Sequence, residues 1–420
     1  KSVIRLNKEQ QNKSREDPSL FYRSLNKSLQ DETIYIQGAT LKKNYVDISV
    51  ATPRFSSIPR TVGRTARIVS ALSDNDIEQI NIRTMNGDLE VAELNINRKE
   101  FDSTNNFKGS VREIVNKSSL ISPTNPTLYS NANFQPRVKF PEFTWSMSPA
   151  LKHQIGGPEG FYLGQLWWRT DTTLKLRRGV SLYTSFGINI YDTFNDLNNP
   201  SDSKLPHVRS DIQDYLSEGK NNLQKMKLEY MFSPYKDVFV RTDLGLIEEM
   251  FGGIGGEIYY RPFNKRFSTG LSLHRVKQRE YKQRFGFRDY ETTTGHLALY
   301  YDFFDGVSAQ LYAGKYLAGD KGITLDLSRR YKSGFSLGVF ATKTNVSKEI
   351  FGEGSFDKGF YFSIPTELFY SDYRTGNISF GLHPLTKDAG SFLTIHNSLF
   401  SILGDTNKFN IERDIDDLTK

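Results

Sequence analysis

Hydrophobic positions repeat with two different periods along this chain. Between residues 17 and 101 they recur twice at helical spacing, and each helical stretch is followed by two extended runs. The Asn86-Gly87 pair joins the last two runs, and this dipeptide favours a tight hairpin turn. The pattern predicts two helix–strand–strand units in tandem, which would form a small α/β domain over residues 1–115.

From the end of that domain the period changes. Residues 116–137 are rich in Ser, Asn and Pro, which is typical of a linker. Beyond them apolar and polar residues alternate, and this alternation predicts strands with one apolar and one polar face. We expect about fourteen strands over residues 138–405, the last near 389–400, and a short C-terminal tail over residues 406–420.

The connections between the expected strands alternate between tight turns and longer loops. Short turns on one side and long loops on the other are typical of an outer-membrane β-barrel, in which the short turns are periplasmic. An even strand number would place both chain ends, and with them the α/β domain, in the periplasm. A soluble β-fold would also show alternation, but several runs reach nine or more residues, which is enough to cross an outer membrane at a tilt.

Composition agrees with this interpretation. Hydrophobic residues make up 37% of the 420 residues, and no apolar run approaches the length of about 18 residues that a spanning helix needs. The 30 Phe and 22 Tyr argue against a disordered chain. In a barrel only alternate residues face lipid, so aromatic belts and low average hydrophobicity are compatible. The net charge of +7 is dispersed over many segments, so we expect no nucleic-acid partner.

Residues that could carry chemistry form no recognisable motif. The absence of cysteine excludes disulfides and thiolate chemistry, and the six histidines form no HxH or HExxH pattern. The Gly-rich run at 252–256 lacks the Lys-Ser/Thr of a phosphate-binding loop. We therefore expect no catalytic residue, no metal and no cofactor, and a protein that is not an enzyme.

The polar faces of the expected strands supply the candidate functional residues. Charges of both signs on a barrel wall usually form a cross-strand network, although they can also select what passes. Tyrosines on the same face could stack on sugar rings. The lumen candidates are Lys175, Arg177, Lys227, Arg241, Asp243, Glu257, Tyr259, Arg261, Tyr300, Tyr312, Tyr316 and Arg330. In the long segment 193–221, Arg209, Asp211 and Asp214 either pair with wall residues or form part of a gate.

Six segments, in order over residues 139–385, resemble the YjbH/GfcD family of bacterial outer-membrane proteins linked to exopolysaccharide and group 4 capsule production. They read IGGPEGFYLGQLWWR, LPHVRSDIQDYLSEG, EEMFGGIGGEIYYRPF, RFGFRDYETTTGHL, YLAGDKGITLDLSRRYKSG and TKTNVSKEIFGEGSFDKGF. The resemblance implies a non-enzymatic barrel in export or assembly of exopolysaccharide or capsule. It implies polysaccharide and periplasmic capsule-export proteins as partners, besides outer-membrane lipid.

Members of that family are longer, so we expect this chain to be a C-terminal portion that pairs with a further barrel segment. Two other interpretations remain open at this stage. One is a general porin or a glycan-binding outer-membrane receptor, for which an open lumen would be expected. The other is an outer-membrane enzyme that modifies lipid or glycan, which would need a Ser–His or carboxylate pair within the lumen.

Overall fold

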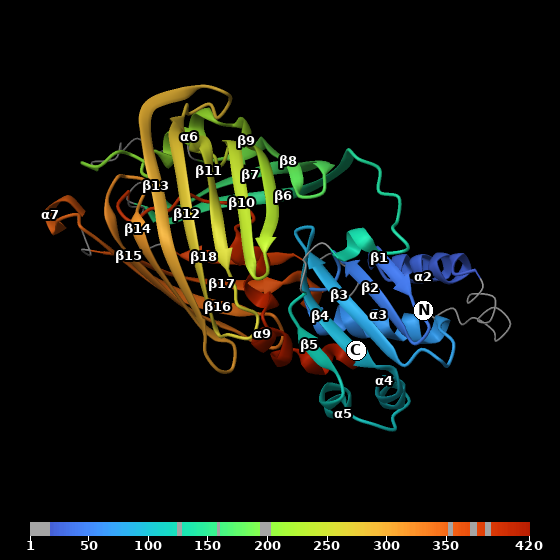
Figure 1. Ribbon diagram of the computed structural model, residues 1–420. Coiled ribbons are helices and arrows are strands. Elements are labelled where there is room, and N and C mark those ends of the chain that lie inside the picture. The colour runs from blue at the N-terminus through green and yellow to red at the C-terminus, as the bar shows by residue number, and fades with distance from the viewer. Residues whose placement is uncertain are drawn as a thin grey trace.

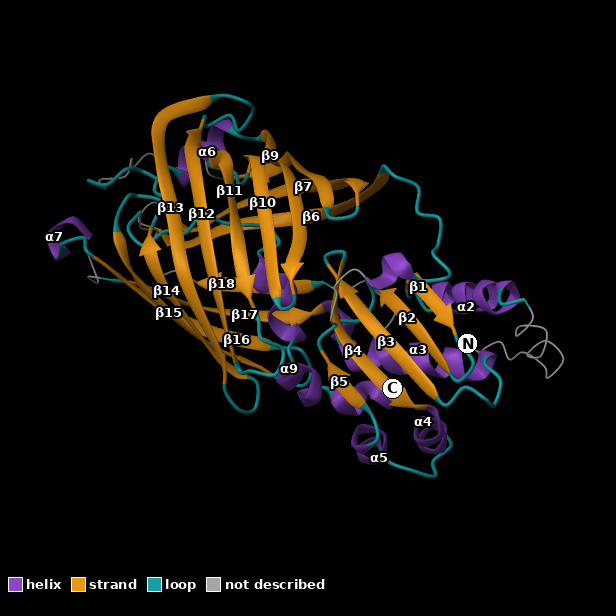
Figure 2. Cartoon of the chain, in the orientation of Figure 1, coloured by secondary structure: helices purple, strands orange, loops and turns teal. Residues whose placement is uncertain are grey.

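The fold was analysed in a computed structural model, which describes residues 17–123, 128–157, 160–193, 203–351, 356–369, 376–382 and 388–420. An α/β domain comes first and a large antiparallel sheet follows it (Figure 1). The large sheet curves strongly, and the α/β domain lies against one end of it (Figure 2). The space in front of the concave face of the large sheet is called the lumen below.

The α/β domain contains the two expected helix–strand–strand units. The first is α2 (Ser19–Asp31), β1 (Tyr35–Leu41) and β2 (Tyr45–Ala51), and the second is α3 (Ile58–Leu72), β3 (Gln79–Asn86) and β4 (Leu89–Asn97). Helices α4 (Arg98–Asn105) and α5 (Val111–Asn116) and strand β5 (Ser119–Ile121) complete it. The sheet order is β1-β2-β3-β4-β5, with β2 and β3 parallel and the other neighbours antiparallel.

Local sequence explains the helices of this domain. The Ser57 hydroxyl caps α3 by accepting a hydrogen bond from the Arg60 amide, and Pro59 occupies the first turn, where a missing N–H costs nothing. The helical stripes then pack on the sheet. Val62 and Val69 of α3 and Leu25 of α2 are fully buried, which accounts for the core of the domain.

Residues 116–137, expected to be a linker, instead extend the α/β domain. They contribute β5 to the edge of the sheet and the 3₁₀ turn η1 (Leu128–Asn131). Phe134 then bridges to Ala39 and stacks on Tyr22, with 4.9 Å between the ring centroids. Their Ser/Asn/Pro-rich composition does indicate irregular backbone, but it does not show that this backbone packs on the preceding domain.

The large sheet confirms the prediction of a mainly β fold. It has 13 strands, each antiparallel to its sequence neighbours, in the order β6 to β18. The strands are β6 (Glu142–Gly157), β7 (Gly160–Arg177), β8 (Val180–Asp192), β9 (Asn221–Tyr235), β10 (Val238–Leu246), β11 (Phe251–Tyr260), β12 (Phe267–Arg279), β13 (Phe287–Asp302), β14 (Val307–Lys315), β15 (Lys321–Arg330), β16 (Ser336–Thr344), β17 (Asp357–Pro365) and β18 (Asn377–Leu382). Among the described residues, no pairing joins the edge strands β6 and β18.

The two ends of these strands differ. At the near mouth, beside the α/β domain, tight turns connect the strands, as at Gly179 and Asp237, which both have positive φ. The far mouth has the two longest connections, which include α6 (Ile212–Glu218) and α7 (Lys348–Phe351), although residues 366–376, with η3 (Thr366–Leu368), form a long connection at the near mouth. We call residues 203–219, which contain α6, the strap.

The apolar face of the large sheet points outward and its charged face points into the lumen. On β12, Leu271 and Leu273 are 50% and 60% exposed, whereas Lys227 of β9 and Arg241 of β10 are fully buried. This is the reverse of a soluble protein, in which apolar side chains are buried and charges exposed. Among the described residues, no helix is both long enough and apolar enough to cross a membrane.

The prediction of a fourteenth strand near residues 389–400 is wrong. After β18 the described chain resumes at Asp388 at the far mouth and runs through the lumen to the near mouth (Figure 1). It ends this passage in the short helix α8 (Leu399–Leu403). We call residues 388–403 the lumenal segment. Its backbone has no strand partner among the described residues and is held instead by wall side chains.

Residues 406–420, expected to be a tail, fold onto the α/β domain together with the two residues before them. They form η4 (Gly404–Thr406), α9 (Lys408–Arg413) and η5 (Ile415–Thr419). η5 packs so closely on α3 that a Cβ at Gly63 would lie 1.8 Å from the Leu418 carbonyl oxygen. The chain thus returns to the domain from which it started.

Candidate functional site: the lumen and its C-terminal segment

Three charged side chains form the centre of the lumen wall. The Lys227 Nζ lies 3.2 Å from Asp243 Oδ1, and the Arg241 Nη2 lies 2.5 Å from Asp243 Oδ2. All three side chains are fully buried. Burying charges is costly unless they are paired and hydrogen-bonded, so each of them depends on the others.

The same two cations hold the lumenal segment. Lys227 Nζ and Arg241 Nη1 each donate to the His396 carbonyl at 2.9 Å, and Arg241 also donates to the Asn397 carbonyl. The His396 ring stacks on Tyr183 of β8, with centroids 4.5 Å apart. Backbone carbonyls of an irregular segment need donors when they are buried, and here the wall provides them.

The next residues are fixed by β11 and β13. The Leu399 amide, at the start of α8, donates to Glu257 Oε2 at 2.9 Å. The Phe400 ring stacks on Tyr300 with centroids 4.0 Å apart and an interplanar angle of 8°. Tyr259 packs edge-on against Phe400 at 6.2 Å. Two of the expected lumen tyrosines therefore bind the chain's own C-terminal segment.

At the near mouth, Arg261 and Arg330 bind residues that follow the lumenal segment. Arg261 donates to the Thr406 hydroxyl and, at 3.1 Å, to the Val91 carbonyl in the α/β domain. Arg330 pairs with Asp405. Arg261 therefore connects three parts of the molecule: the wall, the returning chain and the α/β domain.

The β3–β4 hairpin of the α/β domain also contacts the lumenal segment. Asn86 Nδ2 donates to the Ile402 carbonyl at 2.6 Å. Asp88, two residues on, accepts from Lys175 Nζ at 2.8 Å and from the Gly179 amide at 3.1 Å. The hairpin tip thus lies against the near mouth, where it contacts both the wall and α8.

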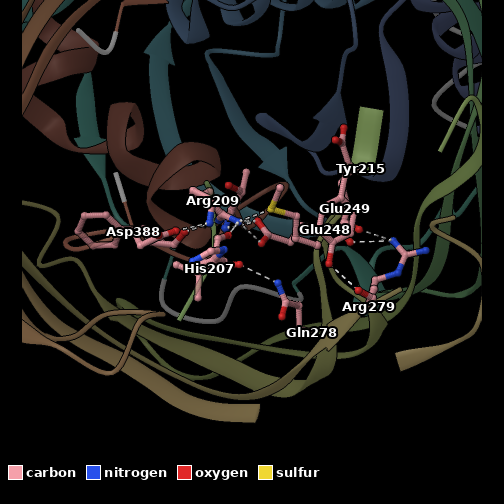
Figure 3. A network of polar contacts seen from close by, with 12 residues as sticks. His207, Arg209, Tyr215, Glu248, Glu249, Gln278, Arg279 and Asp388 are labelled. Atoms are coloured by element: carbon pink, nitrogen blue, oxygen red, sulfur yellow. Dashed lines mark hydrogen bonds and ion pairs between the residues drawn. The ribbon is translucent and has the colours of Figure 1, made fainter. Parts of the chain in front are cut away.

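At the far mouth a polar network ties the strap to the start of the lumenal segment (Figure 3). Arg209 forms a bidentate pair with Glu248, at 2.8 and 3.0 Å. The second oxygen of Glu248 also accepts from the Thr394 amide at 2.9 Å. Asp388 accepts from the Arg209 amide at 2.8 Å and from the Ser210 amide at 3.0 Å.

A second strap network surrounds Asp211. Its carboxylate accepts from Tyr281 at 2.7 Å and Arg288 at 2.8 Å, and lies 2.6 Å from His207 Nδ1. Burial opposes the charged form of Asp211, but hydrogen bonds from Arg288, Tyr281 and His207 hold its pKa below the ordinary value. Burial likewise opposes charged His207, but its contacts with the Ser203 carbonyl and Asp211 raise its pKa.

Two of the expected charged residues do not lie in these networks. A register shift between Lys175 and Arg177 leaves Arg177 exposed, with its guanidinium 5.7 Å from the Tyr230 ring on the outer face. Asp214 is exposed on α6. The alternating pattern could not reveal the shift, because a bulge changes the face of every later residue in the strand.

A cavity of about 660 Å³ remains between the wall and the lumenal segment. Tyr259, Tyr300 and Tyr312 line it from β11, β13 and β14. Tyr316 lies beside it, fully buried, and donates to or accepts from the Thr324 hydroxyl at 2.7 Å. The four expected tyrosines are thus gathered in one region of the lumen, in or beside this cavity.

Residues 3–405 match the family described as exopolysaccharide biosynthesis protein YbjH. This chain belongs to the YjbH family. A curated relative, the uncharacterized lipoprotein YjbH of Escherichia coli (strain K12), is 38% identical over 277 residues. The aligned region covers 63% of this chain and 39% of that relative, so the chain spans about two fifths of the length of the relative.

Solved structures give weaker likenesses to this YjbH family member. Salmonella typhi OmpF in complex with daunomycin is 9% identical, covers 60% of this chain and 93% of that one, and gives a TM-score of 0.31. A loop-deletion mutant of Vibrio cholerae OmpT is 7% identical, covers 58% and 93%, and gives 0.29. At these TM-scores the likenesses assign no fold to the YjbH family chain, whose architecture is defined by its own strand pairing.

Several residues of the site could not be found from sequence. Glu248 and Asp388 hold the two ends of the far-mouth network, and Phe392 and Phe400 line the cavity from the lumenal segment. Each lies in a loop or in the segment taken for a strand.

Proposed function

We propose that this protein is a non-enzymatic outer-membrane β-barrel that takes part in the export or assembly of exopolysaccharide. The assignment of exopolysaccharide as the exported material rests on membership of the exopolysaccharide biosynthesis family. The observation that carries the membrane assignment is the reversed polarity of the large sheet, with apolar residues exposed and charged residues buried. In lipid an apolar outer face is favourable, and a further barrel segment between β6 and β18 would satisfy the unpaired backbone groups of the two edge strands.

The outer face has the composition expected at a membrane. Leu271 and Leu273 on β12, and Leu297 and Leu299 on β13, are all at least half exposed. Aromatic side chains follow at the near mouth, where interfacial belts would lie. They are Tyr235, Tyr260, Phe267, Tyr301, Phe303, Phe304 and Tyr331.

Polar residues replace the apolar ones toward the far mouth. Arg275 of β12 pairs with Glu291 of β13 at 3.2 Å, and the two side chains are 70% and 55% exposed. Because both side chains point outward, this pair would mark the edge of the apolar band on the side of the far mouth. A band bounded by aromatic residues at one end and by charges at the other supports a spanning orientation.

We place the near mouth and the α/β domain in the periplasm. Most connections at the near mouth are short and the two longest connections lie at the far mouth, and outer-membrane barrels keep their short turns in the periplasm. The α/β domain would then be available to periplasmic capsule-export proteins. The edge strands β6 and β18, which do not pair with each other among the described residues, would accept a further barrel segment.

The lumen supports a role without catalysis. The buried charges are used to bind one another and the lumenal segment, as the Lys227–Asp243 and Arg241–His396 contacts illustrate. A general porin is less well supported, because the lumenal segment occupies the space through which solutes would diffuse. The charged wall therefore serves to hold an internal segment that export partners could displace.

The test uses the native protein in a bacterium that makes it. We expect it to float with outer-membrane vesicles, and its deletion to reduce secreted polysaccharide, with restoration by the wild-type gene. A matched variant pair, Leu271→Arg and Arg275→Leu, distinguishes the lipid face from the rim, since only the first should impair membrane assembly. A protein that remains monomeric in buffer without detergent would contradict the proposal.

A further inference from the structure

The cavity between the wall and the lumenal segment has the size of a ligand site. Its volume of about 660 Å³ falls within the range of roughly 300–1,000 Å³ that is usual for ligand pockets. Its lining comes from β11 to β17 on one side and from residues 390–400 on the other. A ligand bound there would therefore contact both the wall and the lumenal segment.

Aromatic rings provide much of that lining. Tyr300 stacks on Phe400, and Tyr312 meets Tyr300 edge-on with centroids 5.9 Å apart. Phe392 packs edge-on against Tyr312 at 5.4 Å. Packing of this kind fixes the rings before any ligand arrives, and the flat faces of aromatic rings with nearby hydroxyls suit sugar rings.

One buried polar atom in the lining lacks a partner. His296 is 6% exposed, lines the cavity, and packs against Tyr316 and Phe392 with centroids 4.7 and 4.5 Å apart. Its Nε2 has no hydrogen-bond partner among the described residues. A buried nitrogen without a partner is costly, so a ligand hydroxyl that binds to it would remove this cost.

Acidic side chains outnumber basic ones in the described lining, although Glu257 is paired with Arg241, whose Nε lies 3.6 Å from Glu257 Oε2. Glu257, Asp326 and Asp357 line the cavity, whereas Arg209 is the only lysine or arginine among the described lining residues. The Arg209 guanidinium is already engaged by both oxygens of Glu248. A carboxylate on a ligand would therefore meet like charge without a free guanidinium to pair with, which disfavours acidic ligands.

We infer that this cavity binds a short stretch of polysaccharide made of neutral or amino sugars, and that it rejects uronic acids. The choice of a polysaccharide rests on the proposed function. The aromatic rings would stack on the sugar faces, His296 Nε2 would bind a hydroxyl, and the carboxylates would accept from hydroxyl or ammonium groups. Since residues 390–400 form part of the lining, the bound sugar also contacts the segment that fills the lumen.

The test compares three oligosaccharides of equal length on the purified full protein in detergent. Cellotetraose represents neutral sugars, the tetramer of glucosamine represents amino sugars, and tetragalacturonate represents uronic acids. By isothermal titration calorimetry we expect the first two to bind at least about tenfold more tightly than the third, which corresponds to about 1.4 kcal/mol. Equal or tighter binding of tetragalacturonate, or no binding of any sugar, would overturn the inference.

Variants identify the cavity as the place of binding. His296→Phe keeps an aromatic ring but removes Nε2, and we expect about a fivefold loss of affinity for cellotetraose, as for one lost hydrogen bond. Asp326→Asn keeps an oxygen that can accept from the Tyr361 hydroxyl but removes a negative charge from the lining. We therefore expect the difference in affinity between cellotetraose and tetragalacturonate to become smaller. Asp289→Asn makes the same change at an exposed position outside the lining and should change neither value.

Folding and function are checked separately. Heat-modified migration in gel electrophoresis verifies that each variant is folded, and His296→Gln provides a second variant if His296→Phe does not fold. Loss of secretion on deletion of the gene, together with no sugar binding, would contradict the inference and leave the proposed function standing. Sugar binding by a protein that does not enter membranes would contradict the proposed function alone.

Discussion

The guanidinium of Arg241 donates to the backbone carbonyl of His396, 2.9 Å away, although 155 residues separate the two in sequence. The same guanidinium neutralises the fully buried Asp243. One side chain therefore holds the lumenal segment and compensates a buried charge of the wall. The contacts at the two mouths act at the ends of the segment, whereas Arg241 acts near its middle.

Replacement of Arg241 by methionine is expected to release the middle of the lumenal segment. The change removes both carbonyl contacts and leaves Asp243 with one fewer cation, at a cost of about 3–5 kcal/mol in the free energy of unfolding. Hydrogen exchange over residues 395–400 and conductance in planar bilayers should both rise. Arg241→Lys retains a cation beside Asp243 and is expected to have a smaller effect, so equal effects of the two variants would count against this anchor.

Loss of Arg209 is expected to loosen the other end of the segment. Arg209→Ala removes the bidentate pair with Glu248, whose second oxygen also binds the Thr394 amide. Hydrogen exchange should increase over residues 388–394 and stay unchanged over 396–403, where Arg241 and Glu257 hold the chain. The exposed Arg275, changed to alanine, is the matched control, and an equal response there would refute a specific role for Arg209.

The strap is expected to become less stable as pH rises. The folded pKa of His207 lies above its ordinary value of 6.5, so the His207–Asp211 contact contributes fully below that value and is lost as pH rises through the folded pKa. The pKa of Asp211 is lowered, so its charge persists across this window. Because the His207 side chain is 34% exposed, solvent screens the pair and the effect is small.

Hydrogen exchange of residues 203–218, corrected for intrinsic rates, measures this dependence. We expect greater protection at pH 6 than at pH 8.5. His207→Gln should abolish the difference while leaving the Arg288–Asp211 contact in place. Protection of these residues that increases with pH in the wild type would contradict the predicted loss of strap stability at high pH.

Replacement of Gly63 by alanine is expected to displace the C-terminal residues. Alanine is favoured over glycine in a helix by about 1 kcal/mol, yet its Cβ would lie 1.8 Å from the Leu418 carbonyl oxygen. We expect a net destabilisation of about 1–3 kcal/mol and faster exchange over residues 415–420. Gly381→Ala, where the nearest atom lies 3.9 Å from the new Cβ, is the control and should be nearly neutral.

The loss in free energy of unfolding caused by an arginine on the outer face should depend on how deep that position lies in the membrane. Leu271→Arg lies within the apolar band and is expected to cost about 2–4 kcal/mol in unfolding from lipid vesicles. Thr293→Arg lies near the Arg275–Glu291 pair at the rim and should cost about 0–1 kcal/mol. Equal costs at the two positions would argue against a bilayer around this face.

The sequence predicted the parts of the fold in which local pattern and environment agree. On β9, Leu228 and Tyr230 point outward while Lys227 and Glu229 are buried, as their alternation predicts. The strand predicted at residues 389–400 is wrong, because a short apolar stretch does not show whether its backbone pairs with a neighbouring strand. Hydrogen bonds to wall side chains, which sequence does not reveal, took the place of a ladder.

The candidate site was predictable only in part for the same reason. Inward-facing wall residues such as Asp243 and Tyr300 follow from strand periodicity. Their partners, such as the His396 carbonyl and the Phe400 ring, come from a segment whose path depends on the whole tertiary structure. Arg177 shows a further limit of strand periodicity as a predictor, because a single bulge places this residue on the outer face.

The return of the chain through the lumen restricts the order in which the protein can assemble. Residues 404–420 fold onto the α/β domain, with Arg60 meeting Asp417 across 357 residues of sequence, while Asp388 is tied to the strap at the opposite mouth. A segment held at both mouths cannot easily enter along the axis of a sheet that has already curved around it. We therefore expect the strands to wrap around residues 388–403 as the large sheet forms, so that this segment acts as a template during folding.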